Sequence, residues 1–195
     1  MNHSDGPTGV PQLSNQKAEI VDVIANLFRR RGYDGVSLGD ISAATGLGKS
    51  SLYHHFPGGK EEMASTVVEQ AACNMQDFVF APLQAGDSLE AKVDGMISSV
   101  TRIYGGGDDP CLLASLLSSD ENGPLAEKAA ALIRLWAERI ANALRAEGVE
   151  RKEARKKGML AVALIQGGLI TSKAFASGEP FKEAMATARA VLLAR

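Results

Sequence analysis

Apolar side chains recur every three to four residues along most of this 195-residue chain, which is the period of an amphipathic α-helix. The period predicts helices over residues 16–31, 60–80, 88–104, 110–118, 124–147, 150–176 and 181–193. Residues 81–87 are expected to form a loop, because Pro82 and Gly86 interrupt the pattern. No stretch alternates between polar and apolar residues as a half-buried strand does, so the sequence predicts an all-α fold.

A short helix is predicted to begin just after Ser37. Asp40 follows Ser37 by three residues, which is the spacing of a capping box at a helix start. Gly46 suits the end of this helix, because glycine tolerates the left-handed backbone conformation found there. The segment is therefore a short helix with a defined start and end.

A second short helix is predicted to follow and to stop before Pro57. Its apolar residues Leu52 and Phe56 are four apart and face inward. The outer side then carries Lys49, Ser50, Ser51, Tyr53 and His54. Two short helices joined by a tight turn, the second with an exposed polar face, are typical of a helix-turn-helix.

This segment resembles the DNA-binding signature of the tetracycline-repressor (TetR) family of bacterial transcription regulators. The likeness covers GYDGVSLGDISAATGLGKSSLYHHFPGGKEEM and extends from about Ile20 to Met63. LYHHF with a following Lys is its most specific part. The form FPGGKEE has one residue more than the family's commoner Phe-x-x-Lys spacing. Together with the downstream segment CLLASLLSSDENGPL, it resembles the LmrA-like subgroup.

The resemblance implies an N-terminal helix-turn-helix DNA-binding domain over residues 14–57 and a helical ligand-binding and dimerisation domain over residues 58–195. The second short helix would enter the major groove of a pseudo-palindromic operator. Base contacts would come from Lys49, Ser50, Ser51, Tyr53 and His54, and phosphate contacts from Ser37, His55 and Lys60. Phosphate contacts set the register without reading the sequence. Gly39 stands where some relatives carry a base-reading side chain, so one contact is expected to be missing.

The resemblance also implies that a small-molecule effector controls DNA binding from a pocket in the second domain. The candidate residues are large apolar side chains and one amide, namely Met75, Met96, Val100, Leu113, Leu116, Leu117, Trp136 and Gln166. Trp136 is the strongest candidate, because an indole offers a broad stacking face and one hydrogen-bond donor. The alternative for each is plain core packing. The resemblance to the LmrA-like subgroup suggests that the effector would be aromatic or amphipathic and that the target gene would serve efflux or detoxification.

A homodimer is the third implication, formed when the last two long helices of each subunit pack into a four-helix bundle. Residues 159–175 are apolar nearly all round, which a helix facing water should not be. Gly167 and Gly168 would let a partner backbone approach closely. The candidate interface residues are Leu164, Gly167, Gly168, Thr171, Phe175 and Leu192. The alternative is a helix fully buried within one subunit.

The charge distribution does not by itself indicate DNA binding. The net charge is −2, and residues 14–62 carry six basic and six acidic side chains, so the prediction depends on the motif. Arg29–Arg31 lie in the last turn of a predicted helix, where cations suit the helix dipole. Phosphate contact and ion pairing are the alternatives for these arginines.

The chain shows no feature of a secreted or membrane-bound protein. Residues 1–13 carry two prolines and two glycines without a period, and we expect a disordered arm there. No signal peptide is recognisable. The longest apolar run, 159–170, is shorter than the roughly 20 residues that span a bilayer. We therefore expect a cytoplasmic protein that does not contact membranes.

Other chemistry finds little support in the sequence. Cys73 and Cys111 are expected to be reduced, packed thiols, with a redox-sensing pair as the alternative. Gly48–Ser51 lacks the upstream glycine of a phosphate-binding loop. His54 and His55 diverge by about 100° on a helix and cannot share a metal ion. We expect no metal and no cofactor. An enzyme remains an alternative, and it would leave the helix over 49–56 buried or blocked.

Overall fold

The computed structural model describes residues 15–85, 88–119 and 123–194, so the arm predicted for residues 1–13 lies outside the described chain. Its elements are α1 (Asn15–Arg31), α2 (Leu38–Thr45), α3 (Lys49–His55), α4 (Gly59–Asn74), η1 (Met75–Phe80), α5 (Ala81–Ala85), α6 (Leu89–Ile103), η2 (Gly105–Gly107), α7 (Leu112–Leu117), α8 (Pro124–Ala146), α9 (Arg151–Phe175) and α10 (Glu179–Leu193). η1 is a π-helix and η2 is a 3-10 turn. The described residues contain no strand, which confirms the all-α prediction.

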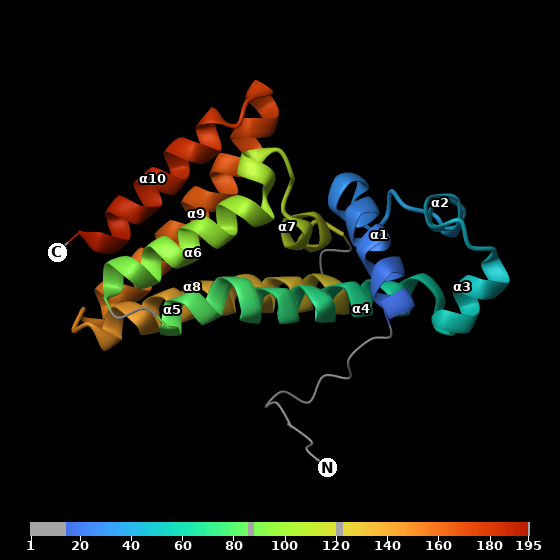
Figure 1. Ribbon diagram of the computed structural model, residues 1–195, viewed down its shortest axis with the longest axis horizontal. Helices are drawn as coiled ribbons and strands as arrows, with labels where there is room; N and C mark the ends of the chain where they lie inside the picture. The colour runs from blue at the N-terminus through green and yellow to red at the C-terminus, as the bar shows by residue number, and fades with distance from the viewer. Residues whose placement is uncertain (1–14, 86–87, 120–122, 195) are drawn as a thin grey trace, which may run out of the picture.

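Helices α1 to α3 form a small unit, here called the head, at one end of the molecule (Figure 1). Ile24 and Phe28 of α1, Ile41 of α2 and Leu52 of α3 are buried in one apolar cluster. α2 begins at the predicted capping box and ends at Gly46, whose φ is 69°. α3 begins directly after Gly48. The head therefore has the two short helices of a helix-turn-helix, packed on α1.

Helix α4 continues without a break through the π-helix η1 into α5, so one helical rod leads from the head into the remaining helices, here called the body (Figure 1). The prediction of a loop over residues 81–87 is wrong for residues 81–85. Pro82 lies inside this continuous rod and removes one backbone N–H donor from it. Because proline has no N–H, one carbonyl in the preceding turn lacks its helical donor. Asp77 and Phe78 lie in that turn and are exposed, so water can donate a hydrogen bond to that carbonyl instead. Leu83 is buried and stabilises the added turn.

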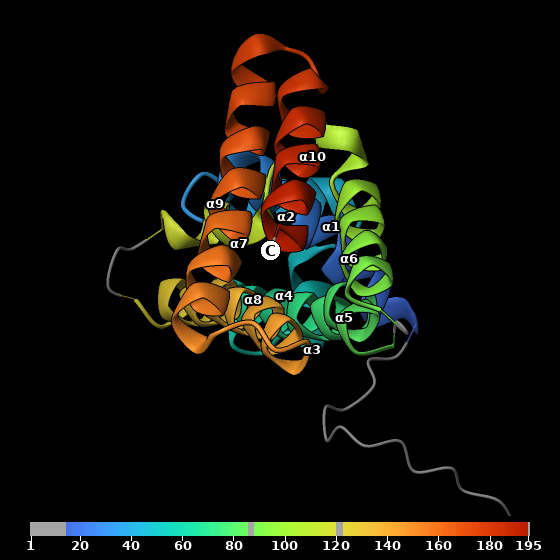
Figure 2. The same ribbon diagram turned by 90° about the vertical axis from the view of Figure 1, so that its left-hand side faces the viewer.

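The body surrounds its core with the rod, α6 and α8 to α10, and α7 lies between this core and α1 (Figures 1 and 2). α9 packs mainly on α10 and α8. Gly158 of α9 lies so close to α8 that a Cβ there would be 2.4 Å from the Ala137 carbonyl oxygen. Trp136 of α8 is 2% exposed and Phe181 of α10 is fully buried in the same core.

Candidate DNA-binding surface and effector cavity

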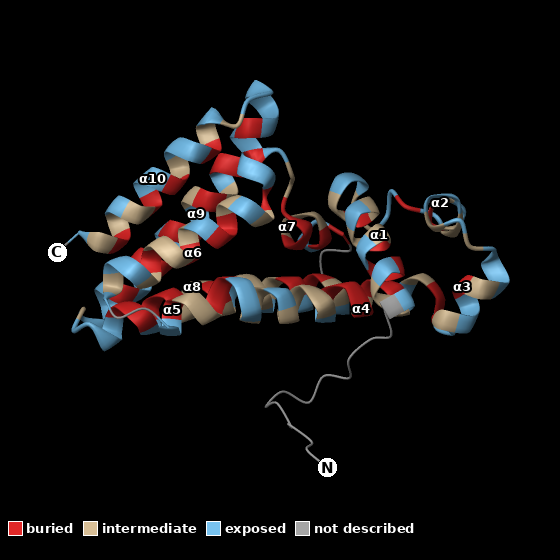
Figure 3. Ribbon diagram, in the orientation of Figure 1, coloured by how far each residue is buried: buried red, intermediate tan, exposed pale blue. Residues whose placement is uncertain are grey.

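The outer face of α3 is open to solvent (Figure 3). Lys49, Ser50 and His54 are exposed, Tyr53 is 47% exposed, and Ser51 and His55 are half-buried. Leu52 and Phe56 are buried on the opposite face. Because α3 is neither buried nor blocked, a DNA duplex has free access to the predicted base-contacting side chains. The enzyme alternative predicts that this helix is buried or blocked, and the open face of α3 differs from that prediction.

The turn after α3 uses the additional residue of the FPGGK segment. Gly59 has a φ of 66°, a left-handed conformation that suits glycine, and its N–H donates to the Phe56 carbonyl at 2.9 Å. The Gly58 N–H donates to Glu62 Oε2 at 2.7 Å, which fixes the start of α4. A Cβ at Gly59 would lie 3.5 Å from Tyr53 Cε1, so the turn packs against the Tyr53 ring.

The predicted phosphate contact Ser37 is engaged in the cap of α2. Its hydroxyl accepts the Asp40 N–H at 3.1 Å and donates to Asp40 Oδ2 at 2.5 Å, and the Ser37 N–H donates to the same carboxylate at 2.8 Å. Arg31 Nη1 lies 2.9 Å from Asp40 Oδ1. The hydroxyl and backbone N–H of Ser37, followed by Arg31, hold the pKa of Asp40 well below its usual range. Ser37 therefore holds the start of α2.

The predicted phosphate contact Lys60 lies at the start of α4. Its ammonium is 4.1 Å from the centre of the Tyr33 ring, which is a cation–π contact. Burial raises the pKa of Tyr33, with further contributions from Glu61 and Asp34, so the phenol stays protonated. The Tyr33 N–H donates to Ser119 Oγ at 3.3 Å. Sequence reasoning did not identify Tyr33, because its contact with Lys60 depends on the packing of α1 against α4.

All three arginines at the end of α1 have acidic neighbours. Arg29 Nη1 lies 4.0 Å and Arg30 Nη2 lies 3.4 Å from the Asp109 carboxylate. Arg31 pairs with Asp40, as described above. Ion pairing, one of the three interpretations of this run, is therefore present. Asp109 follows η2, so these pairs join the head to the body.

A cavity of about 440 Å³ lies where the head meets the body. Four predicted pocket residues, Met75, Val100, Leu113 and Trp136, line it. The lining also includes a group from α1 that sequence reasoning missed, namely Val21, Asp22, Ala25, Asn26 and Arg29. The remaining lining residues come from α4, η1, α6 and the segment 111–112, together with Tyr104, which ends α6. The cavity is therefore lined partly by the head.

The other four predicted pocket residues do not line this cavity. Met96 and Leu116 are fully buried in the core, and Leu117 is 41% exposed. Gln166 is half-buried and donates from Nε2 to the Cys111 Sγ at 3.4 Å. A ligand role for these four stays a prediction.

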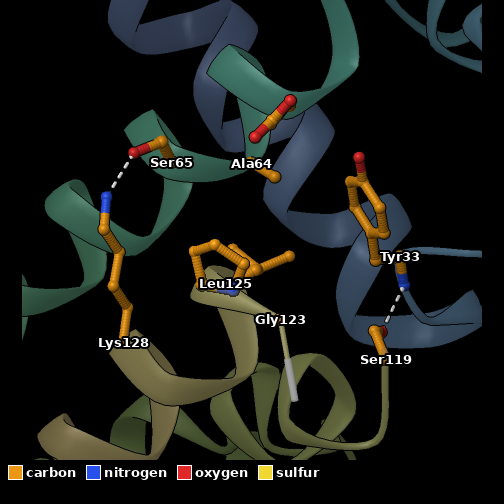
Figure 4. Close-up of a pocket in the computed structure, with 9 residues that line it drawn as sticks. Tyr33, Ala64, Ser65, Ser119, Gly123, Leu125 and Lys128 are labelled. Carbon is orange, nitrogen blue, oxygen red and sulfur yellow. Dashed lines mark hydrogen bonds between the residues drawn. The ribbon is translucent and has the colours of Figure 1, made fainter. Parts of the chain in front are cut away.

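A second cavity, of about 310 Å³, lies between the end of α1, the start of α4 and the start of α8 (Figure 4). Tyr33 and Ser119 stand on one side of it, and Lys128 bonds Ser65 Oγ at 2.7 Å on the other. None of the predicted pocket residues lines it. Both polar and apolar side chains line it, and it lies between the head and the body.

The predicted dimer residues fall into two groups. Gly167, Thr171 and Phe175 are exposed, the last at 73%, and Leu164 is half-buried. Gly168 and Leu192 are buried inside the subunit, and a Cβ on Gly168 would lie 2.7 Å from Ala184 Cβ of α10. Gly167, by contrast, has no atom within 4 Å of such a Cβ apart from its own helix and chain neighbours. The two adjacent glycines thus face different surroundings.

The exposed side of α9 is apolar. Met159, Ala163, Gly167 and Ile170 follow one another at helical spacing and are all exposed, with Ile170 at 68%. By length and composition α9 passes a test for a membrane span, with a mean hydropathy of 1.4 over 18 residues of which 39% are buried. The core helix of a soluble protein has the same length and apolar composition, so these two properties are only weak evidence for a membrane span.

The cysteines and acidic groups suggest no metal centre. Cys73 is half-buried and Cys111 is buried, and both are free thiols. Within the described ranges, no group of three or more His, Cys, Asp or Glu side chains is arranged to hold a metal ion.

Two family models match the chain. The model of bacterial regulatory proteins of the tetR family matches residues 20–67, and that of the C-terminal domain of LmrA/YxaF-like transcriptional regulators matches residues 85–187. The HTH-type transcriptional regulator LmrA of Bacillus subtilis is 25% identical over 162 residues, which are 81% of this chain and 86% of that protein. IcaR of Staphylococcus epidermidis, the negative regulator of the biofilm operon icaADBC, is 40% identical over 63 residues, which are 32% of this chain and 34% of that protein.

The fold has close counterparts among solved structures. The crystal structure of a TetR transcriptional regulator from Legionella pneumophila matches with a TM-score of 0.80 and 20% sequence identity, over 91% of this chain and 97% of that one. At this identity the likeness concerns the fold. The LmrA/YxaF-like model covers more than half of the chain, and the tetR model covers the helix-turn-helix. The chain therefore belongs to the TetR family of transcriptional regulators, with an LmrA/YxaF-like C-terminal domain, and is not an enzyme.

Proposed function

We propose that this regulator is a repressor that binds a pseudo-palindromic operator as a homodimer and leaves it when an aromatic or amphipathic effector occupies the 440 Å³ cavity. The observation that carries the proposal is the exposed polar face of α3 on a capped helix-turn-helix. The 40% identity with IcaR, a negative regulator, supports repression. By analogy with the LmrA-like subgroup, we expect a target gene for efflux or detoxification.

In the proposed complex, α3 lies in the major groove. Lys49 would donate to guanine, Ser50 and Ser51 to either kind of base, and Tyr53 and His54 would add ring and hydrogen-bond contacts. Lys60 and His55 would hold phosphates, with Tyr33 supporting the Lys60 ammonium. We place the boundary between the DNA-binding and regulatory domains at residues 57/58, within the Pro-Gly-Gly turn that separates α3 from α4.

The homodimer would cover the exposed apolar stripe of α9. Met159, Gly167 and Ile170 expose apolar surface that a partner copy would remove from water. Leu164, Thr171 and Phe175 flank the stripe. On α10, Ala186 and Ala190 are exposed and small enough for close helix packing. Gly168 and Leu192 would support the interface from within the subunit by fixing α9 on α10.

The effector would act on the head directly. Five residues of α1 line the cavity, opposite Trp136 of α8 and Met75 of η1. A ligand in this position contacts both the DNA-binding unit and the body, so its binding would shift one against the other. Two recognition helices must lie about 34–36 Å apart, or a multiple of that, to enter successive major grooves. A shift of each head therefore weakens both half-sites at once.

The experiment that tests the DNA-binding role compares three variants on an operator selected from random duplexes. Tyr53→Ala should abolish specific binding with unchanged helicity by circular dichroism, because Tyr53 is exposed and its loss opens no core cavity. Lys60→Ala should weaken all sequences alike and lower the slope of log K against log salt by about one. The control is Lys182→Ala, an exposed lysine on α10. Normal operator binding by Tyr53→Ala would refute the assignment of α3.

A further inference from the structure

Two hydrogen-bond donors at the 440 Å³ cavity have no partner. The indole Nε1–H of Trp136 and the guanidinium Nε–H of Arg29 are buried, and neither meets an acceptor among the described residues. Both side chains line the cavity. A buried donor without an acceptor is costly, and few such groups occur in folded proteins. The two donors therefore suggest that something other than this chain supplies the acceptors.

Several of the polar groups near these donors are already engaged or lie elsewhere. The Tyr104 hydroxyl donates to Cys111 Sγ at 3.3 Å, and Cys111 also receives the Gln166 amide. Burial, followed by the Cys111 thiol, raises the pKa of Tyr104 well above its usual value, so Tyr104 stays neutral and offers no negative charge to Arg29. The Asp109 carboxylate lies 4.0 Å from Arg29 and is shared with Arg30. The one acidic lining residue, Asp22, is exposed.

The rest of the lining indicates what else the ligand must carry. Val100, Leu113 and Val79 are buried apolar residues of the cavity wall, and the Trp136 ring adds a flat aromatic surface. A volume of about 440 Å³ lies within the usual range of small-molecule pockets, roughly 300–1,000 Å³. An apolar ring system fits this wall, and one anionic group would meet the donors.

We infer that the effector is an anionic amphiphile, an aromatic body with a carboxylate or sulfonate that accepts hydrogen bonds from Arg29 and Trp136. This inference rests on the proposed effector function and specifies its ligand class. Arg29 belongs to α1 and Trp136 belongs to α8. The anionic group would thus be held by the head and the body together, which links recognition of the charge to the position of the head.

The test uses two fluorescent probes that differ by one anionic group. Anilinonaphthalene sulfonate is phenylnaphthylamine with an added sulfonate. Trp136 is the only tryptophan in the chain, so energy transfer from it reports a probe bound nearby. Affinity for both probes is measured with the wild type, Arg29→Met, Arg30→Met and Trp136→Phe. Arg30 is the matched control, because it is the adjacent arginine, pairs with the same Asp109 and does not line the cavity.

Arg29→Met should lower the affinity for the sulfonate probe roughly tenfold, since a charge-assisted hydrogen bond is lost. It should change the affinity for the neutral probe by less than about twofold. Arg30→Met should change the affinity for either probe by less than about twofold. Trp136→Phe keeps an aromatic ring and loses the N–H, so the sulfonate probe should weaken about threefold or more, measured by its own fluorescence. Unchanged affinity for the neutral probe shows that each variant is folded. Arg29→Lys, which keeps the charge, should weaken the sulfonate probe less than Arg29→Met.

Equal effects of Arg29→Met and Arg30→Met on the affinity for the sulfonate probe would overturn the inference. They would show that both arginines act by long-range electrostatic attraction and that Arg29 makes no direct hydrogen bond to the sulfonate. No effect of Arg29→Met would overturn it as well. If the neutral probe still released operator in either case, the proposed effector function would stand without the anionic group. If neither probe accepted energy from Trp136, both the inference and the cavity's role in the proposed function would fail.

Discussion

At the scale of single residues, the Ser37–Asp40 cap shows what a local pattern can predict. A capping box depends on two side chains three residues apart, so the sequence contains all the required information. The contact between Lys60 and Tyr33 is different, because these residues are distant in the chain and meet only after α4 has packed on α1. The contact of Tyr33 with Lys60, the proposed phosphate-binding lysine, was therefore not predictable from spacing.

Asp40 leads to a prediction about pH. Its pKa is lowered in the folded state, chiefly by Ser37 and then by Arg31. A lowered pKa means that its stabilisation is present above the unfolded pKa of about 3.9 and is lost as the pH falls below that value. Asp40→Asn should therefore melt about 2–4 °C below the wild type at neutral pH. That difference should shrink at about pH 3. Melting followed by circular dichroism checks this, and a difference independent of pH would contradict it.

At the scale of elements, periodicity predicted the helices well, because each amphipathic stripe is a property of one segment. The rod from α4 to α5 shows where prediction from the pattern of a single segment fails. Pro82 and Gly86 signalled a loop, yet Leu83 is buried and the preceding backbone is a π-helix, so packing extends the helix through Pro82. Gly167 and Gly168 give a second example. The helical period places them on neighbouring faces of α9, but it does not say which of these faces α10 covers.

The two glycines give a matched test of helix packing. Gly168→Ala should destabilise the fold by about 1–2 kcal/mol, because its Cβ would lie 2.7 Å from Ala184 Cβ and 3.1 Å from Phe181 Cα. Gly167→Ala should be neutral or stabilising by up to about 1 kcal/mol, since alanine favours helix and no neighbouring atom is within 4 Å. Urea unfolding at one protomer concentration measures both. A larger loss for Gly167→Ala would contradict the close packing of α9 on α10 at Gly168.

At the scale of the whole molecule, the position of the cavity could not be predicted. Its α1 lining depends on the docking of the head against α7, where Ser115 Oγ donates to the Arg29 carbonyl at 2.9 Å across a sequence separation of 86 residues. No period in either segment encodes that contact. The predicted pocket residues came from the body alone, and four of the eight line the cavity.

The exposed stripe of α9 predicts how the proposed dimer can be broken without unfolding the subunit. Gly167→Arg places a long cation on the stripe, and the subunit has room for it. We expect monomers by analytical ultracentrifugation and a loss of operator affinity, because one head contacts only one half-site. Glu138→Arg, at an exposed position on α8, is the control and should stay dimeric. A dimeric Gly167→Arg variant would move the interface to another surface.

The last prediction concerns the coupling between the cavity and the DNA. An effector that prefers the DNA-free arrangement of the heads must, by linkage, bind more weakly when operator is present, and by the same factor by which it weakens operator binding. A coupling of about 1–3 kcal/mol corresponds to a factor of about 5–150. Titrating phenylnaphthylamine against Trp136 fluorescence, with and without operator, gives one factor, and operator anisotropy with and without phenylnaphthylamine gives the other. Unequal factors would show that the two titrations do not report the same pair of binding equilibria. A factor of one in both titrations would show that binding in the cavity does not move the heads.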